Sequence, residues 1–417
     1  MDWLNFKRAK FACYFTNATL ASVFILPPIL FATFHETYGV SYTLLGTLVL
    51  VNYCTQLGVD LVFTFFSHFF NLKKTLRLIP LLNSVGLLIY GLVPSLLPQY
   101  AYAGLLAGTC IFSVSAGLCE VLLSPTIAAM PSDNPERDMS LLHALYGYGS
   151  TAVALISTGF LLLFGTDNWM VLTLAMAVPP AISFILLSTS PLPEISISHN
   201  VRERTPKRRN TGLVLCAMCI FLGGAAELTM TNWISIFIEN ALHLPKMVGD
   251  TLGLAAFTLL LAFARTWYAR RGKNILRTLL WGMGGAAVCY LVAAVSSNAV
   301  VSVLACMLTG LCTGMLWPGT LILMEEKVPN PGVAAYALLA ACGDLGGSIA
   351  PQGMGIVVDA VAASTWAVKL QESLSLSPEQ LGMKAGVLLA AVFPLMGIGV
   401  LLYIKKCHGK SIKSAHS

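Results

Sequence analysis

One carboxylate interrupts a long apolar run at GLCEVLLSP, residues 117–125, in which Glu120 is the charged position. The run extends from about Tyr100 to Met130 and contains no other charge. About 20 apolar residues cross the core of a bilayer, so Glu120 would lie about 15 Å from the end of its helix. A charged group at that depth is costly and indicates a functional site; the alternative is a hydrogen bond that only joins two helices.

A second stretch, GLCTGMLWP at residues 310–318, repeats the first. Gly-Leu-Cys and the later proline recur at one offset of 193 residues, from 117 to 310 and from 125 to 318. Thr313 stands where Glu120 stands in the first copy. Two halves that differ in one buried carboxylate are typical of a duplicated transporter with an asymmetric central site.

The composition excludes an ordinary soluble protein, because 56% of the 417 residues are hydrophobic and only 11% are charged. We predict an all-α membrane protein with twelve transmembrane helices in two six-helix bundles. The apolar runs span about 10–34, 41–66, 75–95, 99–130, 138–165, 168–189, 211–239, 245–269, 275–295, 299–325, 333–361 and 381–404. The predicted parts are an N-terminal bundle at 1–190, a basic cytoplasmic linker at 191–210 and a C-terminal bundle at 211–417.

Basic residues indicate the orientation in the membrane. With these runs as helices, 22 of the 25 Lys and Arg residues, Arg265 among them, fall on one side. That side is predicted to be cytoplasmic and to hold both termini. The compact loops favour the bacterial cytoplasmic membrane. The net charge of +6 is therefore a topology signal and predicts no nucleic-acid binding.

Two further carboxylates fall inside apolar runs, Glu227 in the seventh and Asp344 in the eleventh. Asp60 is a weaker candidate because it lies toward the end of the second run, closer to water. A buried carboxylate that is exposed to the two sides in turn can carry a proton, so Glu120, Glu227 and Asp344 are the predicted proton-coupling residues. Each could instead be a partner in an interhelical hydrogen bond.

Amide and aromatic side chains supply the candidates for substrate binding. The combination of amides and flat apolar rings fits a hydroxyl-rich ring with apolar faces, and a histidine near a helix start could titrate or serve as a structural donor. Membrane tryptophans are also commonly packing or interface residues. The predicted substrate-binding residues are Asn17, Asn52, Gln56, His143, Asn232, Trp233 and Trp317.

An enzyme is not expected. The sequence has no G-x-x-x-x-G-K-[ST] loop, no zinc-ligand cluster and no serine nucleophile elbow. We expect no cofactor and no metal. The expected partners are a small-molecule substrate, protons and the lipid bilayer, and the protein is expected to be a monomer.

The chain resembles the major facilitator superfamily in its twelve runs, its division into six and six, and its basic central loop. It resembles more narrowly the fucose-galactose-glucose/proton symporter family, through Glu120 with Pro125, the stretch 142–149, Glu227 with Trp233, Trp317-Pro318, and the glycines before Pro351. The narrower resemblance implies that Glu120 takes part in proton coupling, and that Asn17, Glu120, Glu227, Asn232 and Trp317 lie near the substrate. The first-helix aspartate of those sugar symporters is missing from residues 20–28, so proton coupling could use Glu227 or Asp344 instead, or be absent.

The leading hypothesis is therefore a secondary active transporter that couples a small polar solute, with a sugar as first candidate, to protons by alternating access. An exporter of drugs or hydrophobic metabolites on the same fold is the nearest alternative, favoured by the apolar helices and the missing first-helix acid. A membrane sensor or scaffold that transports nothing is the third alternative.

Overall fold

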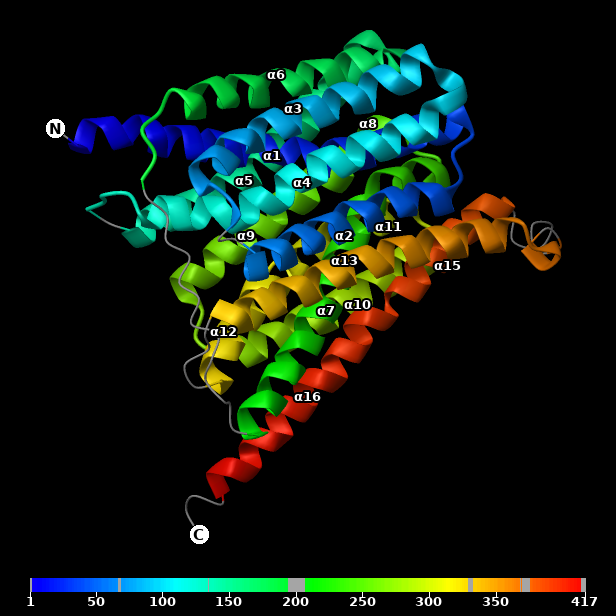
Figure 1. The fold of residues 1–417 in the computed structure, drawn as a ribbon. Coiled ribbons are helices and arrows are strands. Elements are labelled where there is room, and N and C mark those ends of the chain that lie inside the picture. The colour runs from blue at the N-terminus through cyan, green and yellow to red at the C-terminus, as the bar shows by residue number, and fades with distance from the viewer. Residues whose placement is uncertain are drawn as a thin grey trace. The chain divides into compact units, whose positions relative to one another are not determined.

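The computed structural model describes residues 2–66, 69–133, 135–193, 207–328, 333–367, 369 and 376–413. Within these ranges the regular elements are all helical, and twelve segments are long and apolar enough to cross a membrane (Figure 1). The predicted fold class is confirmed. Residues 194–206, which make up most of the predicted linker, lie outside the described residues.

Contacts group the chain into two compact units. Unit 1 comprises Met1–Val40 and Thr47–Ser198, and unit 2 comprises Ser41–Gly46 and His199–Ser417. The first six spans are formed by α1 (Asp2–Tyr38), α2 (Tyr42–Phe66), α3 (Leu72–Leu96), η2 (Pro98–Tyr100) with α4 (Ala101–Ala128), α5 (Pro135–Phe164), and η3 (Thr166–Asn168) with α6 (Trp169–Ser188).

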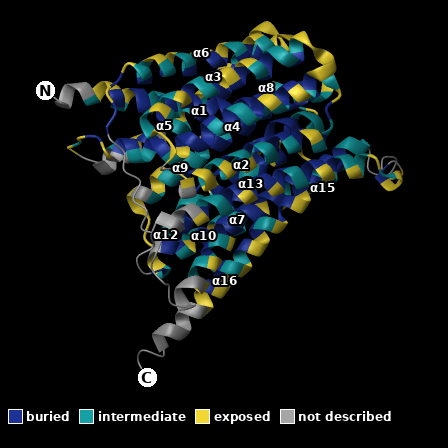
Figure 2. Ribbon diagram, viewed as in Figure 1, coloured by how far each residue is buried: buried dark blue, intermediate teal, exposed yellow. Residues whose placement is uncertain are grey.

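Several of the six later spans are divided. They are formed by α7 (Lys207–Ile236) with η4 (Phe237–Ala241), α8 (Lys246–Val248) with η5 (Gly249–Ala255) and α9 (Ala256–Arg271), α10 (Ile275–Val295), α11 (Ala299–Thr313) with α12 (Leu316–Lys327), α13 (Val333–Ala362), and α15 (Pro378–Ala390) with α16 (Val392–Lys413). The segments η4 and η5 are π-helical. α1 and α7 are buried along most of their lengths, whereas α6 and α10 expose one side (Figure 2).

Side-chain caps define several helix starts. Asn71 accepts a hydrogen bond from the Lys74 N–H at the start of α3, and Ser377 forms a capping box with Gln380 at the start of α15. In unit 2, the Asp359 carboxylate accepts hydrogen bonds from two N–H groups in the first turn of α2, those of residues 42 and 43. These bonds satisfy N–H groups that have no partner within their own helix.

The first and fifth spans of each unit approach closely at a glycine. A Cβ atom added at Gly149 of α5 would lie 2.5 Å from the carbonyl oxygen of Ala18 in α1. One added at Gly224 of α7 would lie 2.6 Å from the carbonyl oxygen of Gly343 in α13. Small residues at both positions allow helix backbones to pack in direct contact, and the shared pattern agrees with a duplicated chain.

The two repeated stretches also pack alike. Gly117 of α4 lies against α2, where an added Cβ would be 2.9 Å from the Val59 Cβ. Gly310 of α11 lies against α9, where an added Cβ would collide with the Phe257 carbonyl oxygen. Each glycine thus lies against the second span of its half. The copies differ in continuity, because α4 is one helix whereas its counterpart is divided into α11 and α12.

Candidate functional site

α4 has one polar side that includes Glu120. Thr109, Ser113 and Glu120 are four and seven residues apart, and these intervals return to the same side of a helix. Thr109 and Ser113 are buried, whereas Glu120 is exposed. Glu120 lies eight residues, or about 12 Å, before the end of α4 at Ala128. A charge-bearing group therefore lies well inside an apolar span.

α2 presents a matching polar side to α4. Asn52, Gln56 and Asp60 follow one another at intervals of four residues. The Asn52 Oδ1 accepts hydrogen bonds from the Gln56 Nε2 at 3.0 Å and from the Ser113 Oγ of α4 at 2.7 Å. Asn52 and Gln56 are buried, and in this structure Asn52 joins α2 to α4 while Gln56 bonds to Asn52 within α2. The bond between Asn52 and Ser113 connects α2 and α4 in the region that also bears Asp60 and Glu120.

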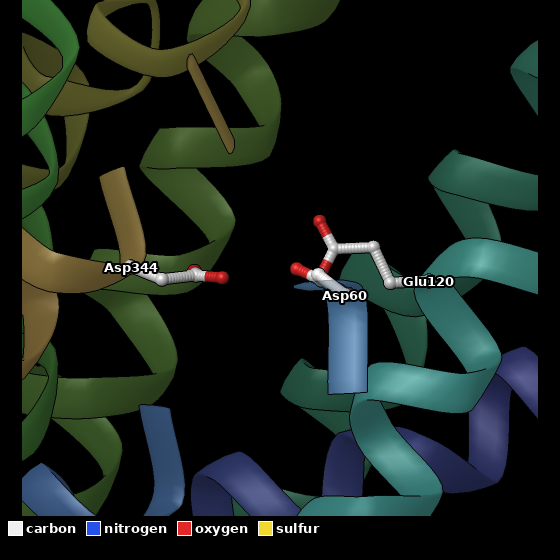
Figure 3. A group of neighbouring side chains, drawn as sticks. All are labelled: Asp60, Glu120 and Asp344. Atoms are coloured by element: carbon white, nitrogen blue, oxygen red, sulfur yellow. The ribbon is translucent and has the colours of Figure 1, made fainter. Parts of the chain in front are cut away.

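Asp60 and Glu120 form a close pair of carboxylates within unit 1. Their side chains come from α2 and α4, and their carboxylate groups lie next to each other (Figure 3). The carboxylate oxygens of Asp60 and Glu120 lie within 4.8 Å of each other. Two charges at 4.8 Å repel by about 3.5 kcal/mol at an effective dielectric constant of 20. A single proton on either carboxylate removes that repulsion.

Asn17 and His143 belong to the same unit. The Asn17 Nδ2 donates a hydrogen bond to the Leu142 carbonyl oxygen of α5 at 2.8 Å, and its Oδ1 accepts one from the Cys119 Sγ of α4 at 3.7 Å. Asn17 therefore joins α1, α4 and α5 at the position adjacent to Glu120. His143 falls within α5, but its side chain lies outside the described part of the structure.

Glu227 of α7 forms an ion pair with Arg265 of α9. The Arg265 Nη2 lies 3.1 Å from the Glu227 Oε1, and the Arg265 Nε donates a hydrogen bond to the Gly314 carbonyl oxygen at 2.9 Å. That carbonyl oxygen has no helical donor four residues later, because Pro318 has no N–H. Arg265 therefore satisfies the carbonyl group at the break between α11 and α12 and joins three spans of unit 2.

Asn232 and Trp233 are buried in α7 and bonded to backbone. The Asn232 Nδ2 donates to the Leu228 carbonyl oxygen within α7 at 2.8 Å. The Trp233 Nε1 donates to the Pro351 carbonyl oxygen of α13 at 3.2 Å. Trp233 is 1% exposed, so in this structure its indole ring is a packing group between α7 and α13.

The Trp317 ring packs against Gly343, the residue that precedes Asp344 in α13. The Trp317 ring of α12 covers Gly343 of α13, where an added Cβ would collide with the ring. Asp344 follows Gly343 and is 4% exposed. Trp317 is half-buried, which leaves part of its ring accessible. Gly343 thus allows an aromatic ring to pack directly beside the predicted proton-coupling residue of α13.

The structure brings together some of the predicted residues and adds two that sequence reasoning undervalued. Asp60, which its place near a span end made a weaker candidate, is the partner of Glu120. Arg265, counted with the cytoplasmic side, lies within the span Lys246–Tyr268 and pairs with Glu227. The spacing of four residues through Asn52, Gln56 and Asp60, and the position of Pro318, were the available signals.

Comparisons with known proteins agree with this architecture. Residues 11–351 match the model of the Major Facilitator Superfamily. A search of curated protein sequences found no match. Among solved structures, a bacterial homologue of the human lysosomal transporter Spinster, inward-facing and occupied, is similar with a TM-score of 0.75 at 12% identity, covering 96% of this chain and 97% of that chain.

Two sugar transporters are also similar. A D-xylose–proton symporter gives a TM-score of 0.71 at 13% identity, covering 94% of this chain and 97% of that chain. The E. coli fucose–proton symporter gives 0.55 at 12% identity, covering 94% of this chain and 98% of that chain. These identities support a shared fold alone. The family model covers most of the sequence, and the chain belongs to the major facilitator superfamily.

Proposed function

We propose that this protein is a proton-coupled symporter of a small polar solute, with a sugar as the first candidate. Membership of the superfamily indicates a transporter rather than an enzyme. The observation that supports proton coupling is the pair of carboxylates, Asp60 and Glu120, within 4.8 Å of each other in unit 1. Such a pair favours the binding of one proton, and its place inside two apolar spans links that proton to a membrane process.

In the proposed cycle, Glu120 is the proton carrier and Asp60 is its positioning partner. Glu120 is exposed and can exchange a proton with water, whereas the hydrogen bonds of Asn52, Gln56 and Ser113 fix the helices on which the pair lies. Repulsion between the two carboxylates stabilises the protonated pair when solute and proton travel together. Glu227 and Asp344 remain predicted proton-coupling residues of unit 2.

Uptake into proteoliposomes tests the proposal. Labelled hexoses and deoxyhexoses are offered with and without an inward proton gradient to wild type, Glu120→Gln and Asp60→Asn. We expect the gradient to drive accumulation only in wild type, while solute exchange without a gradient persists in both variants. The matched control is Glu326→Gln, which removes an exposed carboxylate at the end of α12 and should accumulate solute like wild type.

If wild type accumulates the solute equally with and without the inward proton gradient, proton coupling is refuted. Equal gradient-driven accumulation by wild type and Glu120→Gln would refute only the assignment of Glu120 as the proton carrier. If no sugar moves under any condition, the sugar assignment fails and other polar solutes become the candidates.

Domain boundaries, cellular location and orientation are also proposals. We infer bundles at 1–190 and 211–417, joined by a cytoplasmic linker at 191–210. We also propose that the protein lies in the bacterial cytoplasmic membrane as a monomer with both termini in the cytoplasm. Accessibility of single cysteines introduced near each terminus to an impermeant thiol reagent, in intact and opened cells, tests that orientation.

A further inference from the structure

The guanidinium group of Arg265 keeps unused donors. A guanidinium has five N–H groups. Within the described residues, one on Nε goes to Gly314 and one on Nη2 goes to Glu227, so three of the five remain, one on Nη2 and two on Nη1. Both terminal nitrogens therefore keep at least one N–H for a carboxylate, the anion that guanidinium groups bind most specifically.

The exposed part of Arg265 faces away from the apolar side of its helix. Its side chain is 38% exposed. Leu259, Phe263 and Trp267 form an exposed apolar stripe along α9 at intervals of four residues. Two residues turn an α-helix through about 200°, so Arg265 lies nearly opposite Phe263, on the side that also bears the buried Thr258. A cation on that side of a membrane helix is accessible to a solute in water rather than to lipid.

Glu227 provides an unused acceptor next to these donors. Its Oε1 accepts from Arg265, whereas its Oε2 is buried and has no hydrogen-bond partner among the described residues. Glu227 as a whole is 9% exposed. A buried carboxylate oxygen without a donor is costly, so a ligand that donates a hydrogen bond there would be stabilised.

We propose that Arg265 and Glu227 bind the acid end of an organic-acid solute. The solute's carboxylate accepts hydrogen bonds from the remaining Nη1 and Nη2 donors of Arg265, and a hydroxyl or ammonium group on the neighbouring carbon donates to the Glu227 Oε2. The inference rests on the transport function proposed above, and it replaces the neutral sugar as first candidate with hydroxy acids, which include sugar acids such as gluconate, and amino acids. The Arg265–Glu227 pair is neutral, so a hydroxy acid adds one negative charge that one accompanying proton would balance, whereas a zwitterionic amino acid adds no net charge.

Ligand-induced shifts in the melting temperature of the purified full-length protein at one pH test this inference. The probes are matched pairs in which one member has a carboxylate and the other does not: gluconate with glucose, glycerate with glycerol, and alanine with 2-aminopropanol. We expect stabilisation by at least one acid and by none of the neutral or cationic partners. The glycerate and alanine pairs distinguish a hydroxyl donor from an ammonium donor.

Variants connect the binding to the two residues. Arg265→Gln should weaken binding of the stabilising acid by about tenfold to a hundredfold, because charged hydrogen bonds are lost. The double variant Arg265→Gln with Glu227→Gln should lose binding as well, without leaving an unpaired carboxylate in the fold. The control is Lys384→Gln, which removes a different cation from a span of unit 2, where Lys384 donates to the carbonyl oxygens of Ala294 and Ser296.

Three results would overturn the inference: stabilisation by the partners that lack a carboxylate, stabilisation by no member of the panel, or wild-type affinity for the acid in the double variant. Glucose uptake that follows the proton gradient, with no binding of any acid, would leave the proposed symport standing and remove only the organic-acid specificity. Binding of an acid that depends on Arg265, without proton-driven uptake, would remove the coupling and leave this site.

Discussion

Replacing Arg265 by glutamine should destabilise unit 2 by an amount that depends strongly on pH. The change removes the ionic partner of Glu227, whose side chain is 11% exposed. An unpaired, nearly buried carboxylate can avoid its charge by taking up a proton, which sets an upper limit to the loss. With an ordinary glutamate pKa of about 4.3, that proton costs about 3.7 kcal/mol at pH 7 and about 1 kcal/mol at pH 5.

Two companion variants sharpen the prediction. Glu227→Gln leaves Arg265 with a side chain that is 38% exposed and can be hydrated, so we expect a loss of about 1 kcal/mol that changes little with pH. The double variant has neither charge, and its stability should lie above that of Arg265→Gln at pH 7. The three variants and wild type form a double-mutant cycle for the pair.

The assay is reversible chemical unfolding of the purified protein in detergent between pH 5 and pH 8. The unfolding free energy of Arg265→Gln should approach that of wild type as the pH falls. An equal loss at pH 5 and pH 8, or a double variant no more stable than Arg265→Gln at pH 7, would refute the reasoning that Glu227 depends on Arg265 for its charge.

Three further predictions concern stability. Gly149→Ala should cost about 1–3 kcal/mol because its Cβ would lie 2.5 Å from a backbone oxygen of α1, whereas Gly159→Ala in the same helix, with nothing within 4 Å, should be neutral or stabilising in thermal unfolding. Burial raises the pKa of the Asp138 carboxyl, but hydrogen bonds from Lys10, Ser132 and Tyr14 outweigh this effect and hold the pKa below its usual range. The lowered pKa means that Asp138→Asn should cost about 1 kcal/mol at pH 7 and progressively less as the pH falls below about 4, as measured by unfolding across that range. Asp359→Ala should cost about 1 kcal/mol through loss of the cap on α2, while Asp359→Asn, which keeps an acceptor oxygen, should lose less in the same assay.

The apolar runs were sufficient to predict the fold class and most helix positions. The run at 275–295 coincides with α10, and the run at 75–95 falls within α3. Length and hydrophobicity determine such spans, because a bilayer requires about 20 apolar residues with internally bonded backbone. The division of the tenth span was not predicted, although Pro318 removes a helical donor there. The Gly314 carbonyl oxygen that this break leaves without a helical donor accepts a hydrogen bond from Arg265 instead. Arg265 comes from another helix, so the local sequence does not identify it as the partner.

The candidate site was predicted in part. Glu120 followed from the cost of a charge in an apolar run, a property of the sequence alone. Its neighbour Asp60 depends on how α2 packs against α4, which a single sequence does not specify. Asn52 and Gln56 are four residues apart, a spacing that places them on the same side of a helix, and their hydrogen bond agrees with that. Their predicted contact with substrate stays a prediction.

Proton coupling as proposed requires that the Asp60–Glu120 pair holds one proton. Infrared difference spectroscopy of the protein in lipid at neutral pH reports the carbonyl stretch of a protonated carboxyl group. We expect one such band in wild type that is lost in both Glu120→Gln and Asp60→Asn, because removal of either partner ends the repulsion that holds the proton. A wild-type protein without the band, or a band unchanged in both variants, would contradict the claim.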